Sequence, residues 1–418
     1  MTPALDRADP GASRLLAVEP FSVAGHGGGP RIMRSLLTAA PIDVLAVETA
    51  PRAGARLGDG DDVREVHLPI RPALGRLEST RAHRVLGALD IARLASLTRR
   101  LTSLASGARG PQPLAASTAL HAVLHSLDFI AAHRTSLRLG LPLFLSVHDD
   151  PSYVLRGRAE RAYALSRVGE VWRAAEERFV ISPEMGTTMC DRYGERSYVT
   201  VTDGLEAVEA SPRTGVPGRL TVYFMGAAHL SYEDNFNSLF EALARLRREG
   251  VDARLVTRAG DFGFRVDSRG VPIDSRPWAP QAEVVRDLDD VDVAYMPLPF
   301  GPAHAEFVRC SMSTKMVTYL GSGVPILFHG PGDAAAANLL RGADAAVIAA
   351  SPDPGAIVSA LSADRDRMAR VAGNAVLLAR QQFLLPDIRA RFWGPIVEPG
   401  TRGAPAFADG PRVTQTRP

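Results

Sequence analysis

Lysine and cysteine are the residues that this chain has least of. Its 418 residues include 48 lysines and arginines together, and Lys315 is the only lysine among them. The two cysteines, Cys190 and Cys310, fall in what we expect to be different domains. So low a cysteine count excludes a disulfide framework and a zinc site built from cysteines.

Long apolar runs and clustered charge are also missing. No run approaches the length of a membrane span, and residues 1–13 lack the basic start and apolar core of a secretory signal. We therefore expect a cytoplasmic protein, while association with a membrane surface stays open. The formal net charge is +2 and the arginines are scattered along the chain, so we expect no nucleic-acid partner.

What the sequence does have is a repeated alternation of short apolar runs with helical patterns. Its length exceeds what one hydrophobic core normally holds, which predicts two domains. The alternation is typical of parallel, doubly wound sheets. We predict an α/β fold with two Rossmann-like domains that face one another across a cleft. Expected strands lie at residues 14–18, 42–47, 122–124, 142–147, 178–181, 198–201, 220–225, 254–258, 292–296, 324–328 and 345–348, with helices between them.

Segments rich in proline, glycine and polar residues mark the expected boundaries. Residues 207–218 are short, polar and broken by proline and glycine, which favours a linker. Both chain ends lack apolar periodicity, which predicts disorder. The expected parts are disordered ends at 1–13 and 398–418, domains at 14–206 and 219–383, a linker at 207–218 and a helix at 384–397 that crosses back to the first domain.

Residues 292–331 have the pattern of a complete βαβ unit, with a helix expected at 311–320. Loop and helix start in such a unit lie at the carboxyl edge of the sheet, where open α/β sheets bind ligands. Lys315 falls in the first turn of this helix, beside Ser313 and Thr314. An ammonium meets a phosphate as a point charge, whereas arginine imposes a planar fork. We predict that Lys315 faces a phosphate; the alternative is a solvated surface lysine.

A second glycine-rich loop follows the first expected strand. It holds Gly25, Gly27, Gly28 and Gly29 directly before a helix expected at residues 31–40. Glycines there let backbone N–H groups approach a ligand closely, and Arg31 adds charge. The spacing is not the GxGxxG of dinucleotide folds, so NAD binding is weakly supported. A flexible glycine turn is the alternative.

Three polar residues, His148, Asp149 and Asp150, end the strand expected at 142–147. At that edge a histidine can hydrogen-bond a sugar hydroxyl, and a carboxylate can orient an acceptor or take its proton. The alternative for His148 is a capping histidine. A metal site is disfavoured because no third ligand has a definable spacing.

Two features of the second half extend this pattern. Gly226 follows an apolar strand and opens a loop into a helix, where backbone donors can face a diphosphate. Trp278 lies in the connection between an expected strand and a short helix. Its indole could stack on a nucleobase, although ordinary packing is the more common role.

Together these pieces resemble a GT-B fold glycosyltransferase, most similar to the retaining group called family 4 or group 1. STKMVTYLGSGVPILFHGP resembles that group's K…EYLxSGxPV segment, FVISPEMGTTMCDRYG with VTDGLE is similar to its passage before the linker, and YFMGAAHLSYEDNFNSLFEAL looks like the start of its second domain. The resemblance implies a nucleotide-diphosphate sugar held mainly by the second domain and an acceptor held mainly by the first.

The resemblance also implies roles for individual residues. Lys315 falls near the donor phosphates, Gly226 at the diphosphate turn and His148 at the sugar site, while Gly28 and Gly29 match the loop that closes over donor and acceptor. Two departures concern the nucleotide. Thr318 stands where the family has the carboxylate that holds the ribose. Cys310 stands at the position of the family's earlier carboxylate, with seven residues between the two positions. Glu306 lies nearby but matches neither position. Ala227 and Ala228 replace the usual cations after the turn.

The leading hypothesis is therefore transfer of a hexose-type sugar to an unidentified hydroxyl-bearing acceptor, with retention of configuration and without a metal or other cofactor. Lys315, His148 and Asp149 are the expected catalytic residues. Gly28, Gly29, Gly226, Ser313, Thr314, Lys315, Thr318 and Glu306 are the expected donor-binding residues. Alternatives are a GT-B fold sugar-nucleotide epimerase, a non-catalytic glycosyltransferase-like subunit and, last, an NAD dehydrogenase.

Overall fold

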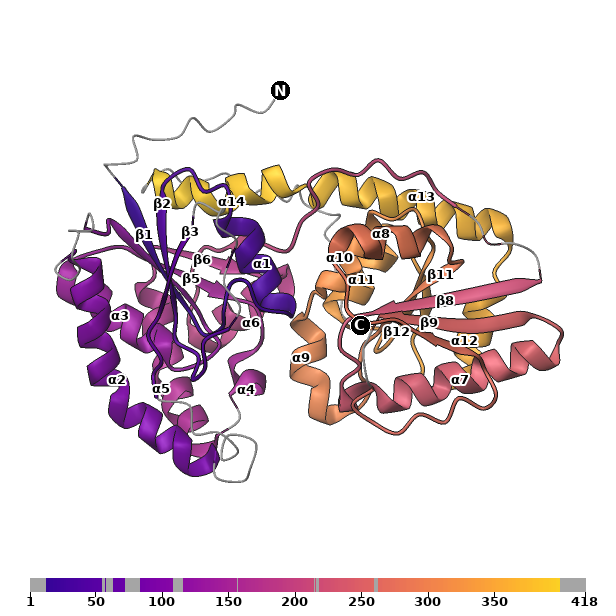
Figure 1. The fold of residues 1–418 in the computed structure, drawn as a ribbon, viewed down its shortest axis with the longest axis horizontal. Helices are drawn as coiled ribbons and strands as arrows, with labels where there is room; N and C mark the ends of the chain where they lie inside the picture. Colours follow the sequence, from indigo (N-terminus) through magenta and orange to yellow (C-terminus); the bar gives the residue numbers. More distant parts are fainter. Residues whose placement is uncertain are drawn as a thin grey trace, which may run out of the picture.

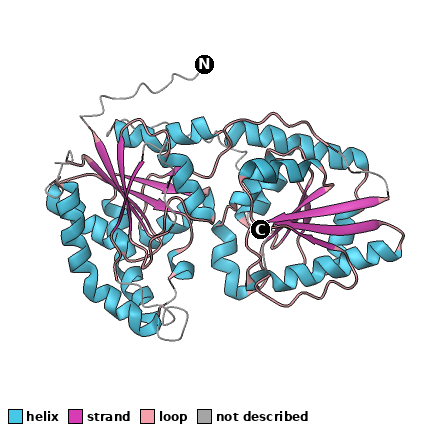
Figure 2. Ribbon diagram, in the orientation of Figure 1, coloured by secondary structure: helices cyan, strands magenta, loops and turns pink. Residues whose placement is uncertain are grey.

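The structure, a computed structural model, describes residues 13–54, 57, 63–71, 83–107, 116–155, 157–213, 215, 218–258 and 262–398. Two parallel sheets with helices packed around them form two domains that face one another (Figures 1 and 2). The predicted α/β fold with two Rossmann-like domains is confirmed. The ends predicted to be disordered lie outside the described residues, apart from residues 13 and 398.

The first domain is built on a seven-stranded sheet in the order β3-β2-β1-β4-β5-β6-β7. Its central strands β1, β4 and β5 are buried along their whole length, because parallel strands covered by helices on both faces must be apolar throughout. The elements are β1 Arg14–Glu19, α1 Gly28–Leu37, β2 Asp43–Glu48, β3 Val63–His67, α2 His83–Ala105, β4 Ala119–Val123, α3 Asp128–Leu139, β5 Leu143–Val147, α4 Pro151–Val154, α5 Arg158–Ala174, β6 Glu177–Val180, α6 Pro183–Tyr193 and β7 Val199–Thr200.

The second domain repeats this arrangement with a six-stranded sheet in the order β10-β9-β8-β11-β12-β13. Apolar clusters cover both faces of this sheet. The strands are β8 Arg219–Met225, β9 Asp252–Arg258, β10 Ile273–Ser275, β11 Val293–Pro297, β12 Ile326–His329 and β13 Val347–Ala349. The helices are α7 Glu233–Arg248, α8 Gln281–Asp289, α9 Ala305–Cys310, α10 Thr314–Leu320, α11 Ala335–Gly342, α12 Pro354–Leu361 and α13 Arg365–Gln382, with short 3₁₀ turns η2 Leu230–Tyr232 and η3 Pro302–His304.

The last helix, α14 (Leu385–Val397), packs on the first domain although it follows α13 of the second (Figure 1). Ile388, Phe392 and Trp393 belong to the hydrophobic core of the first domain. The indole Nε1 of Trp393 donates a hydrogen bond of 2.9 Å to the carbonyl oxygen of Leu36, at the end of α1. The chain thus crosses between the domains twice.

The structure differs from the expected elements in several places. Helix α1 begins at Gly28 rather than near Arg31, so Gly28 and Gly29 form its first turn. Helix α10 begins at Thr314, because Ser311 is extended and Ser313 is the N-cap. Elements β3, β10, α9 and α11 were not predicted. Both unpredicted strands lie at sheet edges, where few apolar side chains are needed.

Candidate functional site

A cleft of about 600 Å³ lies between the domains, at the carboxyl ends of their central strands. From the first domain it is lined by the loop before α1, by α1 and by Asp203. From the second domain it is lined by the loop after β8, by the end of β9 and by the starts of α8 and α10. Of the predicted donor-binding residues, Gly28, Gly226, Thr314 and Lys315 line this cleft.

Lys315 is half-buried in the wall of the cleft. Its Nζ lies 5.3 Å from the ring centroid of Phe224 and 5.5 Å from that of Tyr232. Burial lowers its pKa to about 8. Within the described part of the chain no carboxylate forms an ion pair with this ammonium. Since a desolvated cation without a counter-charge is costly, the site favours an anionic ligand.

The backbone around Lys315 explains its position. The Oγ of Ser313 caps α10 by accepting a hydrogen bond of 3.3 Å from the backbone N–H of Lys315. Gly226 follows β8 with a φ of +87°, and a Cβ on it would lie 3.5 Å from Nζ of Lys315. The N–H of Gly226 already donates to the carbonyl of Arg258. Its N–H is therefore not available to a diphosphate in this conformation, and the positive φ is what favours glycine at position 226.

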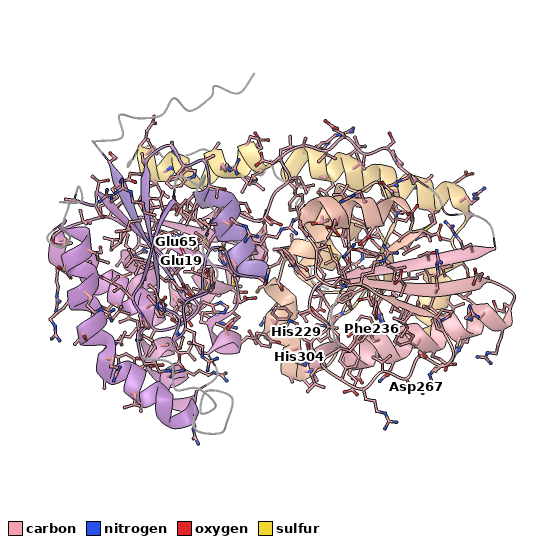
Figure 3. All side chains as sticks on the ribbon, viewed as in Figure 1. Glu19, Glu65, His229, Phe236, Asp267 and His304 are labelled. Atoms are coloured by element: carbon pink, nitrogen blue, oxygen red, sulfur yellow. The ribbon has the colours of Figure 1, made fainter. Side chains whose placement is uncertain are left out.

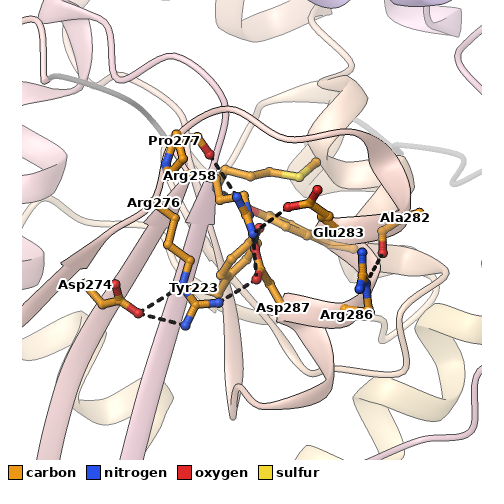
Figure 4. Close-up of polar contacts among 11 residues, drawn as sticks. Tyr223, Arg258, Asp274, Arg276, Pro277, Ala282, Glu283, Arg286 and Asp287 are labelled. Carbon is orange, nitrogen blue, oxygen red and sulfur yellow. Dashed lines mark hydrogen bonds and ion pairs between the residues drawn. The ribbon is translucent and has the colours of Figure 1, made fainter.

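Arg258 is the second cation on this wall, and it is firmly paired (Figure 4). Its guanidinium contacts both carboxylate oxygens of Asp287 on α8, which also binds Arg276. Burial raises the pKa of Asp287, but the hydrogen bonds from Arg258 and Arg276 outweigh it and hold the pKa below its usual value. Arg258 therefore carries its own counter-charge, unlike Lys315.

The first-domain wall places the two predicted glycines differently. A Cβ on Gly28 would lie 3.7 Å from the Cγ2 of Thr314 across the cleft. A Cβ on Gly29 would come within 2.7 Å of the Phe21 ring. Gly28 thus lies at van der Waals distance from the opposite wall, whereas the requirement for glycine at position 29 comes from packing on Phe21 within the first domain.

Arg31 and Asp203 form a polar bridge that sequence reasoning did not assemble. Arg31 Nε lies 2.7 Å from Oδ2 of Asp203, and Arg31 Nη2 donates a hydrogen bond of 3.0 Å to Oγ1 of Thr318. Thr318 also receives a contact of 3.5 Å from the side-chain amide of Gln281. Burial raises the pKa of Asp203, and Arg31 opposes the rise. Arg31 was noted as a source of charge in the sequence, but nothing there connected it to Asp203.

Next to this bridge the domains also meet through two rings. His26, in the loop before α1, and Trp278, before α8, have ring centroids 4.5 Å apart. The indole of Trp278 is nevertheless 64% exposed, so it leaves an aromatic surface at the cleft.

His148 and Asp149 lie outside the lining of this cleft, beyond Tyr232. Burial and, after it, His125 and His121 lower the pKa of His148 to about 3, so its imidazole is neutral. Burial and then Asp150 raise the pKa of Asp149 to about 6. Asp149 lies 4.0 Å from Nδ1 of His125. Burial, then Tyr153 and Asp149, raise the pKa of Tyr232. His229 and His304 lie on the side of the second domain that faces the first (Figure 3).

Glu306 is engaged elsewhere. On α9 it forms ion pairs with Arg309 and with Arg192 of the first domain, and Arg192 also binds the buried carboxylate of Asp150 at 2.6 Å. The rings of Tyr153 and Phe307 stack beside this network with centroids 4.7 Å apart. Glu306 therefore holds the domains together in this structure and lies outside the cleft lined by Lys315.

Two further observations concern ligands and membranes. Among the described residues, no group of three or more potential metal-ligating side chains comes together. A search of the same residues finds no helix with the length and apolarity to cross a bilayer.

Comparisons with known proteins connect this fold to solved structures. Neither a protein-family model nor a curated protein sequence matches the chain. Sucrose-phosphate synthase from Thermosynechococcus elongatus superposes with a TM-score of 0.64 at 13% identity, covering 92% of this chain and 98% of that one. HepE from Anabaena, solved with UDP-glucose, gives 0.61 at 14% identity over 92% and 99%. A UDP-forming α,α-trehalose-phosphate synthase from Burkholderia xenovorans, solved with glucose-6-phosphate, gives 0.62 at 11% identity over 92% and 100%. The chain has the GT-B fold, as its sequence predicted.

Proposed function

We propose that this protein transfers a sugar from a nucleotide-diphosphate sugar to a hydroxyl-bearing acceptor in the cleft between its domains. The observation that carries the proposal is Lys315, a desolvated ammonium in the cleft wall without a carboxylate partner among the described residues. A diphosphate would supply the missing negative charge. The similar proteins support this direction, since their descriptions include UDP-forming synthases and a complex with UDP-glucose.

The chemistry follows from charge and position. The bond between the anomeric carbon and the diphosphate oxygen breaks while the acceptor oxygen bonds to that carbon on the same face, so configuration is retained. The acceptor proton passes to the leaving diphosphate. Lys315 stabilises the negative charge that builds on the leaving group, and Thr314 on the same cleft wall adds a hydroxyl. In this scheme the reaction uses no metal.

His148 and Asp149 serve the sugar and the acceptor in this proposal. Neutral His148 can exchange hydrogen bonds with a sugar hydroxyl at any working pH, because its pKa is lowered to about 3. The pKa of Asp149 is raised to about 6 but stays below neutral pH, so Asp149 is mostly ionised there and able to orient an acceptor hydroxyl. Both belong to the first domain, and Asp149 lies near Tyr232 of the second.

The decisive experiment is calorimetric titration of the full chain with a panel of nucleotide-diphosphate sugars, followed by product analysis with the best binder. We expect at least one to bind, and Lys315→Ala to abolish this binding. Arg370→Ala is a matched control, since Arg370 pairs with Asp344 on the surface of the second domain. Absence of binding to every member of the panel would refute the proposal.

Product analysis also separates the remaining alternatives. Glycosyl transfer requires an added acceptor, whereas an epimerase would release nucleotide and an altered sugar without one. Binding without turnover under either condition would identify a non-catalytic subunit. Thr318 stands where the family that this sequence resembles carries the ribose-binding carboxylate, and this difference is the reason to test for a non-catalytic subunit.

A further inference from the structure

Hydrogen-bonding groups of both domains converge one helical turn beyond Lys315. Thr318 follows Lys315 by three residues on α10, so both side chains lie on the same face of that helix. Gln281 and Arg31 contact the Oγ1 of Thr318 from opposite domains, and Asp203 lies behind Arg31. Arg31, Gln281 and Asp203 all line the cleft.

Asp203 has unused capacity as an acceptor. Its side chain is only 2% exposed. Oδ1 lies 3.3 Å from the hydroxyl of Ser35, and Oδ2 forms the ion pair with Arg31 Nε at 2.7 Å. Each carboxylate oxygen can accept two hydrogen bonds, so these contacts leave acceptor positions that a ligand hydroxyl can use.

The order of groups along the cleft indicates which ligand part would use these acceptor positions. A diphosphate at Lys315 has two neighbours, a nucleoside and a sugar. On the side of Tyr232 lie Asp149 and His125, which suit a sugar and its acceptor. Trp278 also lines the cleft, and the face of its exposed indole suits a nucleobase. Gln281, three residues after Trp278, contacts Thr318, three residues after Lys315, so the groups at this contact connect the two sites and suit the ribose.

We propose that Asp203 of the first domain binds the ribose hydroxyls of the nucleotide, with Arg31 and Gln281 as flanking donors. A ribose diol offers two O–H donors and two acceptors. The carboxylate oxygen accepts from the diol, while the guanidinium and the amide donate to it. The inference rests on the proposed function and deepens it. The second domain holds the diphosphate of the donor, and a carboxylate of the first domain recognises its nucleoside.

The test compares ligands that differ only in these hydroxyls. UDP, ADP and GDP, their 2′,3′-dideoxy counterparts and inorganic pyrophosphate are titrated into the full-length protein by calorimetry. We expect the preferred ribonucleotide to bind about 10- to 100-fold more tightly than its dideoxy counterpart, as expected for hydrogen bonds to a charged group. Asp203→Asn should remove most of this difference and leave pyrophosphate binding unchanged. Asp289→Asn, at an exposed ion pair with Arg213, is the control.

A second variant guards against a folding defect, because Asp203 is buried beside Arg31. Gln281 is exposed at the start of α8, so Gln281→Leu should leave the melting temperature unchanged. We expect it to weaken ribonucleotide binding several-fold and dideoxynucleotide binding not at all.

The outcomes separate this inference from the function on which it rests. Equal binding of ribonucleotide and dideoxynucleotide to the wild-type protein, with both lost in Lys315→Ala, overturns the ribose assignment alone. So does an equal loss of all ligands, pyrophosphate included, in a folded Asp203→Asn variant. Failure of the wild-type protein to bind any nucleotide or pyrophosphate overturns both.

Discussion

The two walls of the cleft are built in different ways. The second-domain wall is held by contacts within its own domain: Ser313 caps the helix of Lys315, and Asp287 fixes Arg258. The first-domain wall has the internal ion pair between Arg31 and Asp203, but it also makes contacts across the cleft, from Arg31 to Thr318 and from the His26 ring to the Trp278 ring. The phosphate-facing groups of the second wall are therefore held without the first wall, whereas part of the first wall is held by contacts that exist only when the domains meet. Phosphate affinity should reside in one domain and discrimination in the other.

The strongest way to break this comparison is to remove the ammonium. Lys315→Ala should lower turnover of the nucleotide sugar roughly 10²–10³-fold, the usual effect of losing one charge-stabilising group. Lys315→Arg should recover only part of this, because a planar guanidinium does not replace a compact ammonium. Steady-state kinetics with circular dichroism as a folding check measure both. Wild-type rates in Lys315→Ala would show that phosphate is held elsewhere.

The pH dependence of phosphate binding sharpens the same contrast. Lys315 has its pKa lowered to about 8 by burial, so the free protein loses this charge as pH rises through 8. Affinity for a nucleotide-diphosphate sugar, whose diphosphate does not titrate in this range, should be flat below pH 8 and fall about tenfold per pH unit above it. Lys315→Arg should remove this limb, because arginine stays protonated. An unchanged limb in that variant would assign the titration to another group.

Asp149 of the first domain leads to a prediction about activity at acidic pH. Burial and Asp150 raise the pKa of Asp149 to about 6. If Asp149 acts as a carboxylate, kcat/KM falls as pH drops through 6, because the protonated form accepts less well. Asp149→Asn should lower kcat/KM about tenfold at pH 7.5 and abolish the acid limb. A limb that persists in this variant would exclude Asp149.

The smallest effect is expected at Glu306, which sequence reasoning placed in the donor site. Because Glu306 pairs with the exposed Arg309 and the half-exposed Arg192, its replacement costs no more than about 1 kcal/mol. Glu306→Gln should change nucleotide affinity less than about threefold, measured by calorimetry. A larger loss of nucleotide affinity would show that Glu306 contributes to the donor site, as the sequence predicted.

The sequence predicted the parts of the fold whose residues carry a local signal. Buried strands such as β1 and β5 are continuous apolar runs, and Ser313 with Thr314 marks the start of α10. Strand β3, with the sequence VREVH, carries as many charged as apolar residues, so the sequence pattern did not predict a strand there. Helix α11 has only eight residues, which is too short a window for helical periodicity to identify it.

In the candidate site, too, the residues with a local sequence signal could be predicted, and the contacts between domains could not. Lys315 could be found because it is the only lysine in the chain. The bridge from Asp203 through Arg31 to Thr318 joins residues of both domains, and no periodicity within a segment encodes such a contact. For the same reason the sequence did not show that Glu306 pairs with Arg192, which belongs to a helix of the other domain.

The crossing of α14 has a consequence for how the protein is made. Its apolar face completes the first domain's core, where Ile388, Phe392 and Trp393 are buried, yet it is synthesised after the second domain. While the ribosome translates residues 219–382, the earlier domain therefore waits with an unfilled groove beside α1. The groove can close only once α14 (Leu385–Val397) has been made, so a premature stop before or within this helix damages the oldest part of the chain, not the newest.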